Sequence, residues 1–165
     1  MADDGTGQRA LLTSYLNDHL MGASAGVDLF NRVAGSYSDT GARAELRALA
    51  DEVAADRDSL LVVMGDLGIR PRIHRMLAGR LAEKVGRLKP NGTLWHRSPL
   101  TDLVELEALR VGVEGKLAMW QALAEGLEGS SLDHAEIEGL IERATAQHKR
   151  LESMRQDAAR RAFVG

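Results

Sequence analysis

Residues 68–99 read GIRPRIHRMLAGRLAEKVGRLKPNGTLWHRSP and decide how the helices of this chain can be arranged. Gly68 is a favourable C-cap for the helical pattern before it, and Pro71 prevents that helix from continuing. Ser98 followed by Pro99 is typical of the first residues of a new helix. The stretch is therefore a long connection between two helical halves of the chain.

Apolar periodicity predicts four long helices around this connection. They are expected over residues 7–34, from the polar turn at 36–41 to residue 67, from 99 to a break at 128–131, and from the capping residue Asp133 to the C-terminus. Since the first two and the last two are joined by short turns, each pair forms an antiparallel hairpin. The whole chain, residues 1–165, is expected to be one domain.

The connection, residues 69–98, contains an amphipathic helix of its own over about residues 72–88. At 1.5 Å per residue it spans about 25 Å, enough to return the chain to the opposite end of the bundle. The second and third long helices would then run parallel, which is the ferritin-like arrangement. The alternative is a five-helix bundle in which the basic helix packs as an equal member.

Composition limits the function classes. The chain has no cysteine, which excludes disulfides, thiolate metal sites and cysteine nucleophiles. The start, MADDGTGQRA, lacks the features of a signal peptide, and no apolar run is long enough to span a membrane. We therefore expect a cytoplasmic protein with no membrane partner.

Charge is distributed unevenly along the chain. Residues 70–97 hold eight Lys and Arg residues and one acid, Glu83, so this segment carries +7 and the remainder −10. The segment could dock on the acidic helices of its own chain, which we favour, or bind an external anion. Trp95 is its single aromatic residue, so nucleic-acid binding is not the favoured interpretation. We expect self-association, as a homodimer, through an outer helix face.

Each long helix has a polar residue near its middle that interrupts the apolar stripe. Because mid-helix positions share one height in a bundle, we expect these side chains in one layer, where ferritin-like proteins place their metals. The structural interpretation is a buried layer of Asp56, Arg110 and Gln147, with Asp56 paired to Arg110. The alternative is an atypical iron, manganese or zinc site, or a small-ligand site, with these candidate metal ligands: His19, Asp56, Glu107, Glu114 and His148.

A carboxylate-bridged di-metal centre requires Glu-x-x-His pairs on two helices. Three residues before His148 stands Thr145, and three before Asp56 stands Val53. The required glutamates are therefore missing, and an arginine in the layer would repel a dication. We favour the structural layer, with no cofactor and no catalytic residue.

Four glycines lie inside two of the predicted helices: Gly22 and Gly26, then Gly112 and Gly115. Each costs about 1 kcal/mol of helix propensity, which calls for a physical reason. A tight helix crossing is the favoured explanation, and a central ligand cavity is the alternative.

Several segments together resemble a known group of proteins. They are residues 82–92 (AEKVGRLKPNG), 98–100 (SPL), 105–107 (ELE), 112–116 (GVEGK) and 15–20 (YLNDHL). As a set they resemble uncharacterised ferritin-like helical-bundle proteins of high-GC, actinobacterial-type bacteria. The resemblance implies a ferritin-like fold and transfers no catalytic residue. The wider superfamily would imply iron binding and oxidation, from which this chain departs at the Glu-x-x-His positions.

Overall fold

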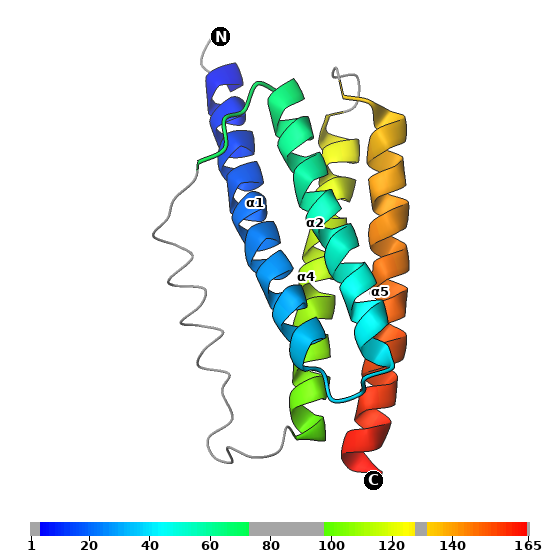
Figure 1. Cartoon of the computed structure of the whole chain (residues 1–165). Coiled ribbons are helices and arrows are strands. Elements are labelled where there is room, and N and C mark those ends of the chain that lie inside the picture. Colours follow the sequence, from blue (N-terminus) through cyan, green and yellow to red (C-terminus); the bar gives the residue numbers. More distant parts are fainter. Residues whose placement is uncertain (1–3, 73–97, 128–131, 165) are drawn as a thin grey trace.

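The computed structural model describes residues 4–72, 98–127 and 132–164. Within them the chain is all helical: α1 (Asp4–Ser36), α2 (Ala42–Asp66), α4 (Pro99–Gly126) and α5 (His134–Phe163). The four long helices lie side by side as two hairpins, α1–α2 and α4–α5 (Figure 1). The all-α bundle predicted from the sequence is confirmed. The amphipathic helix predicted over residues 72–88, and most of the basic segment 70–97, lie outside the described residues.

The second and third long helices run in the same direction (Figure 1). The core shows this independently, since one buried cluster joins the C-terminal halves of α2 and α4 and the other joins their N-terminal halves. The first cluster is Leu16, Leu60, Val63, Met64, Ile69, Met119, Trp120, Leu123, Leu132, Ile137, Leu140 and Ala144. The second is Val27, Phe30, Val33, Ala34, Tyr37, Leu46, Leu49, Ala50, Val53, Leu103, Leu106, Leu109, Val113, Leu151 and Ala158. Each helix therefore contacts antiparallel neighbours, and α2 and α4 lie on a diagonal.

The helix ends form where the capping residues predict. Gly68 adopts φ +64° after α2, the Gly68 amide donates to the Gly65 carbonyl at 2.9 Å, and the Ile69 amide donates to Met64 at 2.8 Å. This is a Schellman motif, which requires the left-handed conformation that glycine adopts without steric cost. Ser98 and Asp133 accept hydrogen bonds from the first turns of α4 and α5, as N-caps do.

The chain that leaves α2 is held by side chains of α1. Arg9 donates to the carbonyls of Leu67 and Gly68, at 3.3 and 3.0 Å. Asn17 accepts a hydrogen bond from the Arg72 amide through Oδ1. These contacts fix the direction in which the long connection departs. No helix of the described residues is long and apolar enough to cross a membrane.

Candidate functional site

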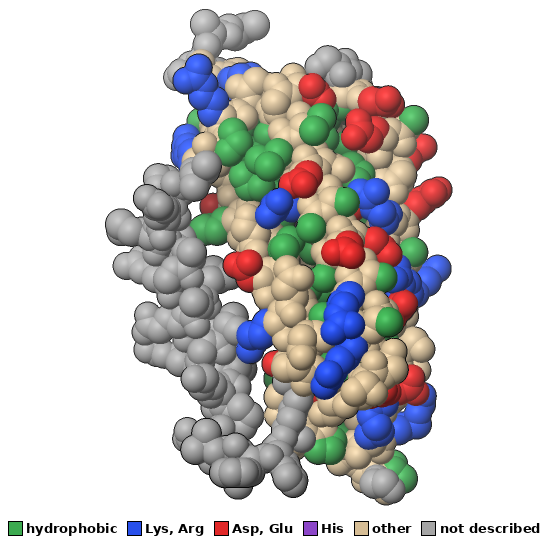
Figure 2. Space-filling model, in the orientation of Figure 1, with side chains coloured by type: hydrophobic (Ala, Val, Ile, Leu, Met, Phe, Trp, Pro, Cys, Tyr) green, Lys and Arg blue, Asp and Glu red, His purple; other side chains and the backbone are tan. Residues whose placement is uncertain are grey.

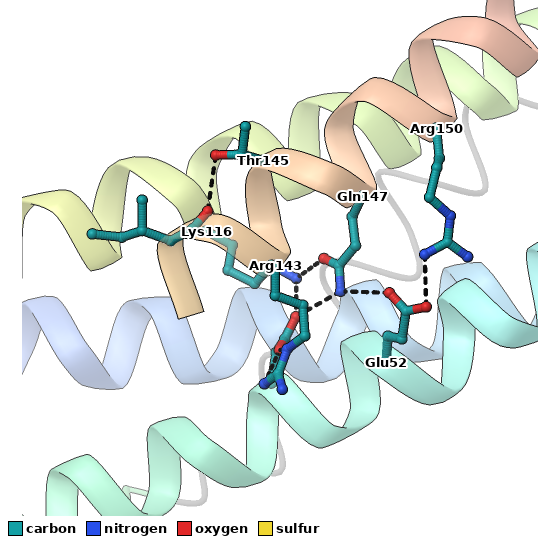
Figure 3. Close-up of polar contacts among 8 residues, drawn as sticks. Glu52, Lys116, Arg143, Thr145, Gln147 and Arg150 are labelled. Atoms are coloured by element: carbon teal, nitrogen blue, oxygen red, sulfur yellow. Dashed lines mark hydrogen bonds and ion pairs between the residues drawn. The ribbon is translucent and has the colours of Figure 1, made fainter. Parts of the chain in front are cut away.

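Asp56 of α2 lies at the centre of a buried polar network between the two core clusters. Its side chain is 1 % exposed. Lys116 of α4 donates to its Oδ2, which also accepts a hydrogen bond from the Gln147 amide of α5 at 3.1 Å. Arg143, one turn before Gln147, binds Oδ1. Lys116, Arg143 and Gln147 converge from two helices (Figure 3), so one carboxylate ties three helices together.

The network continues along α2 and α5 towards the outside. Gln147 Nε2 also donates to Glu52 at 3.1 Å, and Arg150 binds Glu52 and Glu45 at 2.6 Å each. Three carboxylates and three cations are present in the whole network, so its formal charges cancel. On the surface this face shows acidic and basic side chains interspersed over α2 and α5 (Figure 2).

Lys116 is the most constrained cation of the network. Its side chain is 13 % exposed, and Nζ donates both to Asp56 and to the Gln147 carbonyl oxygen. Burial lowers the pKa of this ammonium group, and the attraction of Asp56 opposes the shift. The attraction of Asp56 therefore favours the charged form of the ammonium inside the bundle.

The predicted pairing of Asp56 with Arg110 is wrong. Arg110 lies further along α4 towards its N-terminus and binds Glu152 of α5 at 2.9 Å, near the surface. Lys116 and Arg143 provide the positive charge instead. The other two members of the predicted layer, Asp56 and Gln147, are buried and hydrogen-bonded to each other.

The five candidate metal ligands are not gathered at one point. His148 and Glu114 form a pair at 3.1 Å between α5 and α4, with Glu114 61 % exposed. Glu107 is exposed on α4, His19 stacks edge-on against Tyr15 of α1, and Asp56 is engaged by its own cations. In the described part of the chain no group of three acidic or histidine side chains could hold a metal ion.

A cavity of about 320 Å³ lies on the other side of Asp56, between α1, α2 and α4. All four mid-helix glycines line it: Gly22, Gly26, Gly112 and Gly115. A Cβ atom built on any of them would meet no described side chain or neighbouring backbone within 4 Å. Among residues 4–72, 98–127 and 132–164, the expected tight helix crossing is therefore wrong at these positions, because no neighbouring helix lies within contact distance of a Cβ on these glycines.

The inner wall of this cavity is mainly apolar. It is formed by Phe30 of α1, Val53 and Leu60 of α2, and Met119 and Trp120 of α4. Trp120 is completely buried, and its indole N–H has no hydrogen-bond partner among the described residues. Burial lowers the pKa of His19, also in the wall, although Asp18 opposes the shift, so the imidazole is neutral at pH 7.

Sequence reasoning identified the glycines but not Trp120 as part of a site. The signal was present in part, because Trp120 falls on the apolar stripe of α4 with Val113 and Met119 near it. A residue on the apolar stripe of a helix usually belongs to the core, and the sequence does not show whether its N–H finds a hydrogen-bond acceptor. Comparison of the chain with protein-family models, curated proteins and solved structures found no match.

Proposed function

We propose that this chain is a non-catalytic, ferritin-like helical-bundle protein that binds a small, largely apolar molecule between α1, α2 and α4. The observation that carries the proposal is the cavity of about 320 Å³ lined by four glycines, at which an added Cβ would meet no atom of the described residues within 4 Å. Its volume falls within the range of small-molecule sites, about 300–1,000 Å³. Glycine inside a helix is destabilising, so four of them around one void favour a use for that void.

The ferritin-like part of the proposal is supported by the topology. Two antiparallel hairpins with α2 parallel to α4 require a long connection between them, as in ferritin-like bundles (Figure 1). The cytoplasmic location expected from the sequence belongs to the same proposal.

The polar network supports a structural role for the central layer. Both oxygens of Asp56 accept hydrogen bonds from Lys116, Arg143 or Gln147, so the carboxylate is committed to helices of its own chain. Such a network fixes helix register at some cost in stability. It also closes the α2–α5 side of the bundle, and the cavity lies on the α1–α4 side.

Self-association is the remaining element of the proposal. α4 carries an exposed apolar stripe, Leu100, Val104 and Val111, which are 53, 37 and 68 % exposed. A second copy of the chain is the partner we propose for it. Sedimentation velocity should show a dimer for the wild type and a monomer for a Leu100→Glu, Val104→Glu variant, which leaves Val111 unchanged because Val111 also lines the cavity. A monomeric wild type would refute this element.

Ligand binding is tested by protein NMR with two uncharged probes, flat 2-acetylnaphthalene and globular 1-acetyladamantane. At least one should shift the backbone amides around Gly22 and Gly112. The shifts should disappear in a Gly26→Leu variant, whose side chain would fill the cavity, and persist in Gly139→Leu. Gly139 is the matched control, since it is also a helical glycine with open space but lies on α5 outside the cavity. Failure of both probes would refute the proposed function.

A further inference from the structure

We infer that the dimer forms by antiparallel pairing of the α4 helices of two copies, about a two-fold axis that passes between residues 109 and 110. This inference rests on the self-association in the proposed function and specifies its geometry. Three properties of α4 carry it: the spacing of its exposed apolar residues, the alternation of large and small side chains among them, and the positions of two opposite charges beside them.

Helix α4 is apolar on two opposite faces. Its inner face contributes these residues to the core: Leu106, Leu109, Val113 and Trp120. On the outer face, residues without a polar side chain recur at alternating intervals of four and three, and all but the half-buried Ala108 are exposed: Val104, Ala108, Val111, Gly115, Ala118 and Ala122. A helix with a single buried face has a polar outer face, whereas this spacing is that of two helices packed along each other. The outer face of α4 therefore fits a second helix.

Large and small residues on this outer face complement each other in an antiparallel pair. A parallel two-fold pair would place each residue against its own copy, so that valine meets valine and Gly115 meets Gly115. In the antiparallel pair Val104 of one copy lies opposite Gly115 of the other, where an added Cβ meets no described atom within 4 Å. Ala108 then lies opposite Val111, and both pairings are centred on the same point, between residues 109 and 110. Each valine is thus received by a glycine or an alanine, as knobs-into-holes packing requires.

Two charged residues beside the outer face select this register. Glu107 is exposed, and Arg110, one turn further along α4, is 37 % exposed although it binds Glu152. With the axis between residues 109 and 110, Glu107 of each copy lies only about 3 Å along the helix axis from Arg110 of the other. In a parallel pair the two Glu107 side chains would face each other instead. Charges beside a helix seam determine the orientation and register of the pair, so the antiparallel arrangement is favoured.

Electron paramagnetic resonance distances test the orientation. The chain has no cysteine, so a nitroxide on Glu114→Cys or Gln121→Cys reports the distance between equivalent positions of two copies. Both residues are exposed on one flank of α4, one heptad apart, and neither lines the cavity. At 1.5 Å per residue, the antiparallel pair predicts a distance about 20 Å longer for Gln121 than for Glu114. Equal distances would show a parallel pair and would overturn the inference.

Charge reversal tests the register by sedimentation velocity. Glu107→Arg and Arg110→Glu should each weaken the dimer at least about tenfold, because like charges then meet across the axis. An equimolar mixture of the two variants should recover the wild-type dissociation constant, since opposite charges face each other again. Glu125→Arg is the matched control, because Glu125 is exposed on the same flank but lies opposite no residue of the partner's α4 in this register. It should leave the dissociation constant unchanged.

The outcomes separate this geometry from the proposed function. If Arg110→Glu does not fold, Glu107→Arg and the nitroxide distances decide the same point. A dimer that neither reversal weakens, or a mixture of folded variants that does not recover, would overturn the inference and leave self-association standing. A wild type that stays monomeric would overturn both, whereas ligand binding is tested independently by the NMR probes.

Discussion

The amide of Gln147 on α5 donates a hydrogen bond to the carboxylate of Asp56 on α2 at 3.1 Å, and both side chains are at most 1 % exposed. Arg143 and Arg150 of α5 add further polar contacts to α2, because Arg143 binds Asp56 and Arg150 binds Glu52. The carboxylate of Asp56 also binds Lys116 of α4. A single acidic side chain of α2 therefore contacts both α4 and α5.

Replacing Asp56 by Ala should destabilise the fold strongly. The change leaves the ammonium of Lys116 buried without its counter-charge, which costs about 3–5 kcal/mol in comparable buried pairs. Urea denaturation followed by circular dichroism would measure the loss in the free energy of unfolding. Asp58→Ala is the matched control, because Asp58 is 63 % exposed and its pair with Arg57 should contribute less than about 1 kcal/mol.

A second substitution distinguishes the orphaned charge from a simple packing defect. Adding Lys116→Met to Asp56→Ala removes the buried ammonium and keeps a similar side-chain volume, so part of the lost stability should return. A double variant no more stable than Asp56→Ala alone would contradict the assigned role of Lys116.

Replacing the cavity glycines by alanine should stabilise the protein. Gly22 and Gly112 are within long helices, and a Cβ at either position meets nothing described within 4 Å. Each substitution should therefore add about 0.5–1 kcal/mol to the free energy of unfolding. Gly68→Ala should do the opposite, because Gly68 has φ +64° and its Cβ would lie 3.1 Å from Arg9. Destabilisation by Gly22→Ala or Gly112→Ala would show that α1 and α4 approach each other closely after all.

The sequence predicts much of this fold because local signals and tertiary packing agree. Helix α2 ends just before Gly68, and helices α4 and α5 begin after Ser98 and Asp133. The sequence predicts these ends because the capping hydrogen bonds involve only residues close in the chain. Asp56 and Gln147 could be placed inside the bundle because they interrupt otherwise apolar stripes. Placing Asp56 and Gln147 in this way requires only the face of the helix on which each residue lies.

The pairing inside the polar network could not be predicted in the same way. Periodicity gives the face on which a Cα atom lies, not the point that a long side chain reaches. Arg110 lies on the stripe of α4 yet turns outward to Glu152, whereas Lys116 and Arg143 reach Asp56 from the flanks of their helices. The glycines were ambiguous for a related reason: a close crossing and an open cavity both need a missing Cβ, and only the spacing of α1 and α4 separates them.

Asn17 should control the first residues after α2. Its Oδ1 accepts a hydrogen bond from the Arg72 amide, and its Nδ2 donates to the Thr13 carbonyl at 2.8 Å. In an Asn17→Leu variant the Arg72 amide loses its acceptor and should exchange with solvent faster, which amide hydrogen exchange by NMR would detect. Asn17→Asp keeps the acceptor oxygen and should retain most of the protection. Unchanged exchange in Asn17→Leu would mean that α1 does not hold this segment.

His19 should make the stability of the bundle depend on pH in a defined direction. Burial lowers the pKa of its imidazole in the folded state, with Asp18 opposing and the Tyr15 ring packed edge-on against it. In the unfolded chain the imidazole has its ordinary pKa of about 6.5, so it binds protons at a higher pH than in the folded chain. The free energy of unfolding therefore falls as the pH falls through about 6.5. The fall stops once the pH is below the folded-state pKa.

The free energy of unfolding, measured by denaturation at a series of pH values, should decline less steeply with acid for His19→Gln than for the wild type. His134→Gln is the control, because His134 is an exposed histidine at the start of α5. This variant should show the same decline as the wild type. A His19→Gln variant with an unchanged decline, or an NMR titration of His19 above its ordinary value, would contradict a neutral imidazole in the cavity wall.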